Sequence, residues 1–159
     1  MKRVRTPRKD PVAIAREWIR KKTDPPGFKE DTYGDKGRGV KTLYKRRQGD
    51  FLLQYIGPLV SKEEGERRET KESSGYRFFF SHNGNQFCVD ATKETDFLGR
   101  LINHGSQSGQ NSVMKCIDGH LCLFSTRDIE IGEEILYDYG LKKSQLPWKQ
   151  VLNCEVILF

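Results

Sequence analysis

The sequence predicts a mainly β protein with short helices. Short apolar runs recur between turn residues, a spacing typical of short strands. Two of these turns, Asn83-Gly84 and Asp118-Gly119, are of the kind that joins the two strands of a hairpin. Neither a GxGxxG segment after a strand nor a GxxxxGK(S/T) segment occurs, so a nucleotide-binding βαβ array is not supported.

The chain begins with a basic arm and a short helix. Residues 1–9 contain five basic side chains and no hydrophobic period, which is typical of a disordered arm or a nuclear-localisation patch. A merely solvated tail fits this stretch equally well. From Pro11 to Lys22 the apolar residues share one helical face and the basic residues another. The Asp-Pro-Pro-Gly segment of residues 24–27 then ends the helix.

The strands and a second helix follow in order. Residues 51–60 (FLLQYIGPLV) predict a strand that bends at Gly57-Pro58. Ser61 then opens a charged helix, with Glu64 three positions further on as in a capping box. Two hairpins and a last strand complete the pattern, over residues 76–80 with 86–90, 112–117 with 121–125, and 135–139.

Charge is distributed unevenly along the chain. The net charge is +6 over 159 residues, but residues 1–50 carry +9, residues 51–117 are neutral and residues 118–159 carry −3. A basic leading third indicates attraction to polyanions, and an acidic end indicates attraction to a cationic partner. We therefore expect a polyanion-binding arm attached to a body that accepts something cationic.

Composition argues against several protein classes. No stretch approaches the roughly 18 apolar residues of a membrane helix, and the charged start has no apolar stretch behind it, so neither a membrane span nor a secretory signal is predicted. The cysteines (Cys88, Cys116, Cys122 and Cys154) show no CxxC spacing, and the histidines show no zinc-ligand pattern. We expect a soluble, intracellular protein with reduced cysteines and no bound metal.

Three tracts are too specific to be scaffold alone. They lie at residues 36–40 (KGRGV), 99–104 (GRLINH) and 132–140 (GEEILYDYG). Together and in this order they resemble the SET domain, over about residues 26–140. The run CVDATKETDFLGRLINH and the ending EEILYDYG, followed by Pro147-Trp148, are most similar to the histone H4-tail lysine monomethyltransferase subfamily.

The resemblance implies a fold and an activity. SET domains are built of several small, mostly antiparallel sheets with a threaded C-terminal segment, and they methylate protein lysines with S-adenosylmethionine. Residues 1–25 are then the basic arm and short helix, residues 26–140 the SET domain, and residues 141–159 a C-terminal flank with an atypical apolar tail. The expected reaction is monomethylation of a lysine in the histone H4 tail on nucleosomes, in the nucleus and on chromatin.

Three tyrosines are implied as catalytic residues. By the resemblance, Tyr139 lies beside the transferred methyl group, and Tyr55 and Tyr137 line the lysine channel. A tyrosine at the position of Tyr137 restricts family members to the monomethyl product. Aromatic walls suit this chemistry because they desolvate the lysine ammonium, which lowers its pKa and frees the lone pair for attack. Judged from the residues alone, the three tyrosines would be core aromatics.

The cofactor-binding residues are implied in the same way. The glycine-rich segment lets the backbone approach the cofactor, and a basic residue there can meet its carboxylate. An Asn-His pair contacts the adenosine, one tyrosine contacts the cofactor, and a C-terminal tryptophan covers the adenine. The residues so implied are Lys36, Gly37, Arg38, Tyr76, Asn103, His104 and Trp148. Arg100 is expected to be structural.

The sequence departs from the subfamily beside the expected channel. Gly75 stands where the subfamily has a cysteine, and Gly105 replaces the serine that follows Asn-His. Two alternatives therefore stay open, a catalytically inert nucleosome-binding module and a methyltransferase of a non-histone protein. The expected partners are the histone H4 tail and nucleosome, with non-specific DNA contact through the arm. A monomer without membrane contact is expected, and the carboxylates between Asp118 and Asp138 are candidates for a groove wall that faces the basic tail.

Overall fold

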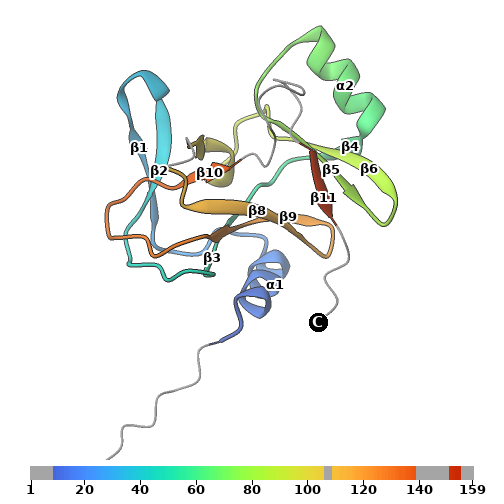
Figure 1. Cartoon of the computed structure of the whole chain (residues 1–159). Helices are drawn as coiled ribbons and strands as arrows, with labels where there is room; N and C mark the ends of the chain where they lie inside the picture. Colours follow the sequence, from blue (N-terminus) through green and yellow to red (C-terminus); the bar gives the residue numbers. More distant parts are fainter. Residues whose placement is uncertain (1–8, 106–108, 139–150, 155–159) are drawn as a thin grey trace, which may run out of the picture.

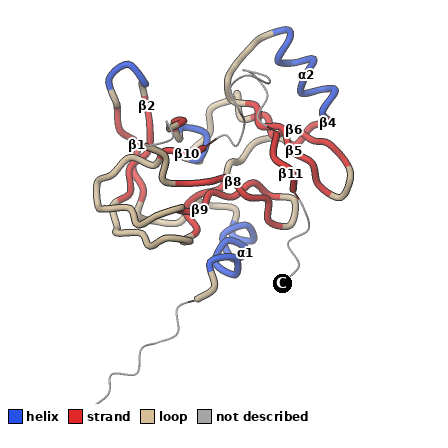
Figure 2. The backbone as a smooth tube through the Cα atoms, viewed as in Figure 1, coloured by secondary structure: helices blue, strands red, loops and turns tan. Residues whose placement is uncertain are grey.

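The computed structural model describes residues 9–105, 109–138 and 151–154. Within these ranges the chain forms three small sheets and two α-helices, joined by loops that make up much of the path (Figure 1; Figure 2). The mainly β fold with short helices and small sheets, expected from the sequence, is confirmed.

The first sheet is a two-stranded hairpin. β1 (Phe28–Thr32) pairs antiparallel with β2 (Arg38–Thr42), and the short 3-10 helix η1 (Gly34–Lys36) joins them. This hairpin stands at one end of the molecule (Figure 1). A bridge between Lys41 and Glu134 ties it to the segment that leads into β10. The glycine-rich tract thereby lies next to the GEEILYDYG tract.

The central sheet has the strand order β3-β9-β8-β10-β7. Its strands are β3 (Phe51–Gln54), β7 (Asn103–His104), β8 (Ser112–Ile117), β9 (His120–Ser125) and β10 (Leu136–Asp138). The neighbours β3, β9 and β8 are antiparallel, whereas β10 runs parallel to both β7 and β8. This insertion of β10 brings the GRLINH and GEEILYDYG tracts side by side.

The third sheet has the order β11-β5-β6-β4 and carries the second helix. Its strands are β4 (Leu59–Ser61), β5 (Arg77–His82), β6 (Asn85–Asp90) and β11 (Val151–Cys154). The helix α2 (Lys62–Lys71) follows β4 and packs against β6. Its N-cap is Ser61, whose hydroxyl accepts a hydrogen bond from the Glu64 backbone N–H at 3.1 Å, as the capping signal predicted.

Both hairpin predictions are confirmed. Asn83 and Gly84 have φ values of 51° and 77°, and Asp118 and Gly119 have φ values of 51° and 83°. Two consecutive positive φ angles define the turn that matches the twist of antiparallel strands, and Asn-Gly and Asp-Gly adopt it at little cost. β5 therefore pairs with β6, and β8 with β9.

The strand predicted over residues 51–60 is instead two strands, β3 and β4, which belong to different sheets. The predicted bend at Gly57-Pro58 is the reason. Pro58 has no backbone N–H to donate, and its carbonyl accepts from the Asp90 N–H at 2.9 Å. A Cβ on Gly57 would lie 2.5 Å from the Asp90 carbonyl oxygen, so the two backbones meet too closely for a side chain.

The predicted first helix is confirmed as α1 (Pro11–Lys21), with the Asp10 side chain accepting from the Val12 N–H. Its apolar face closes a second hydrophobic cluster beneath the central sheet (Figure 1). Ala15 is fully buried there. On the polar face, Arg16 pairs with Asp118 at 2.9 Å, which fastens the helix to the β8–β9 turn.

The cysteines only partly follow the sequence expectation. Cys88 and Cys122 are buried free thiols, and burial raises the pKa of each to about 12. Cys116 is disulfide-bonded, so the expectation of reduced cysteines is wrong for this residue. In the described part of the chain, no helix is long and apolar enough to cross a membrane.

Candidate active site

Tyr137 lies at the centre of the candidate site. It belongs to β10, where it pairs with His104 of β7 on one side and Ser112 of β8 on the other. Its side chain is only 4% exposed. The His104 ring stands perpendicular to the Tyr137 ring, with 6.4 Å between centroids. Tyr137, implied for the lysine channel, and His104, implied for the cofactor, are therefore neighbours on adjacent strands of the central sheet.

Tyr55 reaches the same buried cluster from the end of β3. It is 7% exposed, and its ring packs against Phe78 with 5.7 Å between centroids. Its backbone N–H donates to the Leu121 carbonyl at 3.0 Å, which holds the residue against β9. Tyr55 and Tyr137 are thus both members of the main hydrophobic core. Tyr139 and Trp148, which the resemblance also implies, lie outside the described residues.

The glycine-rich tract converges on the carboxylate of Glu134. Lys36 Nζ lies 3.2 Å from Glu134 Oε1, and Asn103 Nδ2 donates to Glu134 Oε2 at 2.9 Å. The same Asn103 amide donates to the Arg38 carbonyl oxygen at 3.0 Å. A cation, an amide and a carboxylate from three segments therefore meet beside β2, and we call this set the polar cradle.

Gly39 is the floor of the polar cradle. A Cβ at this position would lie 2.5 Å from Glu134 Oε2, 2.8 Å from Asn103 Nδ2 and 2.8 Å from Tyr33 Cδ2. Only glycine lets these groups approach the backbone so closely. Sequence reasoning placed Glu134 on an outer acidic wall and did not single out Tyr33. Tyr33 lies only three residues before the KGRGV tract, and this closeness in sequence could have indicated that it belongs to the site.

Arg38 contributes its backbone rather than its charge to the cradle. Its exposed guanidinium pairs with the carboxylates of Glu94 and Glu30, both of which are themselves exposed. In this arrangement Lys36 is the basic side chain that reaches Glu134, while Arg38 supplies the carbonyl that orients Asn103.

Tyr76 sits beneath the Arg100 guanidinium, with 4.1 Å from the guanidinium carbon to the ring centroid. Arg100 is buried, and its Nε donates to the Ala91 carbonyl at 2.8 Å. The Ala91 N–H in turn donates to the Tyr76 carbonyl at 2.8 Å. Arg100 thereby connects the tract that carries Asn103 and His104 to Tyr76.

A buried ionic cluster anchors the strands behind Tyr76. The Asp90 carboxylate accepts from Arg77 Nε at 3.2 Å, Arg68 Nη1 at 3.0 Å and the Thr92 hydroxyl at 2.6 Å. Burial alone would raise the pKa of Asp90, but these hydrogen bonds outweigh it and lower the pKa to about 2. Asp90 thus remains charged at neutral pH and ties α2, β5 and β6 together.

The two glycine departures have different structural settings. A Cβ on Gly105 would lie 2.9 Å from the Leu136 Cβ, so close packing against β10 requires glycine in this chain. Gly75 has a φ of +73° with open space around it, so its backbone conformation rather than a neighbour disfavours a side chain. The glycine at position 105 therefore fits the close packing against Leu136, whereas a serine there would not.

Three of the carboxylates suggested for a groove wall lie in separate ion pairs. Asp118 pairs with Arg16 at the far turn of β8 and β9, and Glu133 pairs with Arg127 at 2.7 Å. Glu134 pairs with Lys36 in the polar cradle. Each of these three carboxylates is therefore already next to a cation of this chain.

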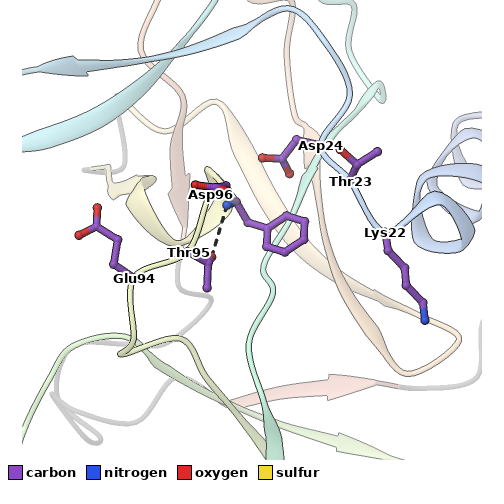
Figure 3. A pocket seen from close by; sticks show the side chains of 7 residues that line it. Lys22, Thr23, Asp24, Glu94, Thr95 and Asp96 are labelled. Atoms are coloured by element: carbon purple, nitrogen blue, oxygen red, sulfur yellow. Dashed lines mark hydrogen bonds between the residues drawn. The ribbon is translucent and has the colours of Figure 1, made fainter.

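One pocket lies between the end of α1 and the loop before η2 (Gly99–Leu101) (Figure 3). It has a volume of about 580 Å³ and is lined by Lys22, Thr23, Asp24, Glu94, Thr95, Asp96 and Phe97. Asp24 accepts from the Leu98 N–H at 2.8 Å, and burial raises the pKa of Asp24. This contact fixes the segment after α1 to the start of the GRLINH tract.

The fold and the arrangement of these tracts define a SET domain. Residues 37–140 match the SET domain family, and the chain belongs to it. N-lysine methyltransferase KMT5A of Xenopus tropicalis is 38% identical over 133 residues, which cover 77% of this chain and 40% of that protein. Histone-lysine N-methyltransferase Set8 of Drosophila melanogaster is 38% identical over 165 residues, which cover 91% of this chain and 23% of that protein.

A solved structure supports the same assignment. CpSET8 from Cryptosporidium superimposes with a TM-score of 0.61 and 36% identity, covering 72% of this chain and 58% of that chain. The resemblance to the H4-tail monomethyltransferase group is therefore confirmed at the level of relatives. The chain spans less than half the length of the two curated relatives named above.

Proposed function

We propose that this chain is an S-adenosylmethionine-dependent protein-lysine N-methyltransferase that monomethylates a lysine of the histone H4 tail on nucleosomes. The observation that carries the proposal is the junction of β10 and β7. There the buried Tyr137 shares a wall with His104, one residue along from the Asn103 of the polar cradle. Kinship with KMT5A and Set8 supports the same reaction.

The residues present fit the cofactor. Gly39 leaves a cradle that a Cβ would fill, and its rim offers an ammonium at Lys36, a carboxylate at Glu134 and an amide at Asn103. These groups complement an amino-acid zwitterion, since the carboxylate of such a ligand favours Lys36 and its ammonium favours Glu134. Lys36, Gly37, Arg38, Tyr76, Asn103 and His104 would hold the cofactor, together with Trp148 beyond the described residues. S-adenosylmethionine, when bound, supplies a methyl group on a positively charged sulfur.

The tyrosines prepare the substrate amine. A lysine amine has a reference pKa near 10.4 and attacks only when neutral. Tyr55 and Tyr137 are buried and aromatic, so a lysine side chain placed between them loses its hydration, and the pKa of the ammonium falls. Their hydroxyls offer directed hydrogen bonds to the neutral amine. A general base is not needed in this scheme.

The proposed partners follow from charge. Residues 1–9 carry five basic side chains, which would contact nucleosomal DNA through its phosphates without reading the base sequence. The enzyme would act in the nucleus as a monomer on chromatin. Its histone substrate would then be held near DNA, where the arm increases the rate of encounter.

We expect the full chain to add a methyl group to the H4 tail of nucleosomes, read by mass spectrometry of the tail peptides. Tyr139→Phe should lower the rate at least about a hundredfold, the scale on which a positioned hydroxyl contributes to catalysis. Tyr44→Phe is the matched control, because Tyr44 is 54% exposed and lies outside the site. Absence of methylation by the unmodified chain, on nucleosomes and on free histones, would contradict the proposal.

Tyr137→Phe should change the product rather than stop the reaction. Removing this buried hydroxyl leaves room near the amine for a methyl group, so we expect dimethyl-lysine to accumulate in the same mass-spectrometric assay. A product that stays monomethylated in the Tyr137→Phe variant would show that Tyr137 does not limit the number of methyl groups. Retained total turnover in this variant separates the effect from loss of folding.

The alternatives are resolved by two measurements. Calorimetric titration with S-adenosylmethionine separates an enzyme from an inert nucleosome-binding module, because the inert module has no need of cofactor affinity. A peptide array, methylated with the same chain, separates the H4 tail from a non-histone substrate.

A further inference from the structure

Tyr33 occupies a position that neither the motifs nor the resemblance assigns to the site. It lies between β1 and η1, at the tip of the first hairpin. Its backbone N–H donates to the Gly37 carbonyl at 2.8 Å, and its carbonyl accepts from the Lys36 N–H at 3.1 Å. These two hydrogen bonds lock Tyr33 to the segment that carries Lys36 and Gly37.

The Tyr33 ring forms part of the polar cradle. The point where a Cβ on Gly39 would stand is 2.8 Å from Tyr33 Cδ2, and the same point is close to the Glu134 carboxylate and the Asn103 amide. Burial raises the pKa of Tyr33, and the negative charge of Glu134, with a smaller effect from Asp31, raises it further. The hydroxyl is therefore protonated at neutral pH and able to donate a hydrogen bond.

This hydroxyl is shielded from solvent and has no hydrogen-bond partner among the residues that the structure describes. A buried hydroxyl without a partner is costly, and most such groups in proteins are satisfied. The Glu134 carboxylate, whose charge acts on the Tyr33 hydroxyl, already accepts from Lys36 and Asn103. The missing acceptor is therefore best supplied by a ligand of the cradle.

We propose that Tyr33 is a further cofactor-binding residue, whose hydroxyl donates a hydrogen bond to the carboxylate at the amino-acid end of S-adenosylmethionine. This inference rests on the proposed function. The carboxylate is the appropriate acceptor because Lys36, the cation of the cradle, belongs to the same hairpin tip, and a hydroxyl and an ammonium together suit an anion. Of the remaining polar groups of the cradle, Glu134 would face the ligand ammonium, and Asn103 already donates to Glu134 and to the Arg38 carbonyl.

The test compares Tyr33→Phe with the unmodified full chain by calorimetric titration with two ligands. S-adenosylhomocysteine carries the amino-acid end, whereas 5′-methylthioadenosine lacks it. We expect the variant to bind S-adenosylhomocysteine roughly ten- to a hundredfold more weakly, the effect of one lost hydrogen bond to a charged group, and to bind 5′-methylthioadenosine unchanged. Tyr44→Phe, on the exposed surface, should bind both ligands like the unmodified chain.

A thermal melt of the ligand-free proteins supplies the second measurement. Tyr33→Phe removes a hydroxyl that lacks a partner, so its melting temperature should be equal to or above that of the unmodified chain. A lower melting temperature would mean that the hydroxyl has a structural partner and would overturn the proposal. Unchanged S-adenosylhomocysteine affinity, or an equal loss for both ligands, would also overturn it. If the unmodified chain binds neither ligand, the proposed function fails together with this inference.

Discussion

Gly99→Ala is expected to destabilise the protein by about 3 kcal/mol or more, the upper end for overpacking a closed interior. A Cβ on Gly99 would lie 1.9 Å from the Gln54 carbonyl oxygen and 3.3 Å from the Tyr55 Cα. The Gln54 oxygen is backbone, and all four residues of β3 are buried, so neither side can yield without moving the central sheet. The displaced segment would carry Arg100, Asn103 and His104 with it.

The measurement for Gly99→Ala is thermal and denaturant unfolding, with a fall in melting temperature of roughly 10 °C for a chain of this size. Gly132→Ala is the matched control. Gly132 has a φ of +84° and open space around it, so alanine there meets only backbone strain of about 1 kcal/mol. An equal fall in melting temperature for the two variants would contradict the close contact between η2 and β3.

Asp90→Ala is expected to cost about 3 kcal/mol. The substitution leaves Arg77, which is buried, with Glu69 as its remaining carboxylate partner, and it removes the acceptor of the Thr92 hydroxyl. Asp90→Asn keeps an acceptor oxygen without the charge. Its stability should therefore lie between that of Asp90→Ala and that of the unmodified chain. Glu30→Ala, which removes an exposed carboxylate, should leave stability unchanged.

The pH dependence of stability checks the same carboxylate. The pKa of Asp90 is lowered in the folded protein to about 2 from a reference near 3.8, so its stabilisation is present above pH 4. Protonation removes this stabilisation, about 2 kcal/mol, as the pH falls from 4 through 2. Asp90→Ala should lack this part of the acid dependence. If the stability of Asp90→Ala and of the unmodified chain fell equally steeply below pH 4, the assignment to Asp90 would be contradicted.

Much of the local structure was predictable because its causes lie close together in sequence. Asp10 and Ser61 cap their helices through N–H groups two or three residues away. Asn-Gly and Asp-Gly set the two hairpin turns by their own backbone preference. Such signals act within a few residues, so no knowledge of the tertiary fold is needed to find them.

The candidate site was predictable in part, for a different reason. The ordered tracts pointed to Lys36, Asn103 and Tyr137, and the structure brings the first two onto one carboxylate. The carboxylate itself, Glu134, was assigned to a different surface. Its role depends on β10 entering between β7 and β8, a long-range parallel pairing that no local pattern reports.

By itself, the sequence determined the class of this protein, the capped helices, the hairpins and the identity of most candidate site residues, because short-range chemistry and ordered motifs carry that information. Only the tertiary structure decided that residues 51–60 serve two sheets, that Arg38 turns outward to Glu30 and Glu94, and that the Tyr33 ring packs at the cradle with its hydroxyl shielded from solvent. These outcomes depend on which distant backbones meet. At Gly39, Gly57 and Gly99 the backbone lies too close to a distant segment to leave room for a side chain. These contacts exist only once the sheets have assembled.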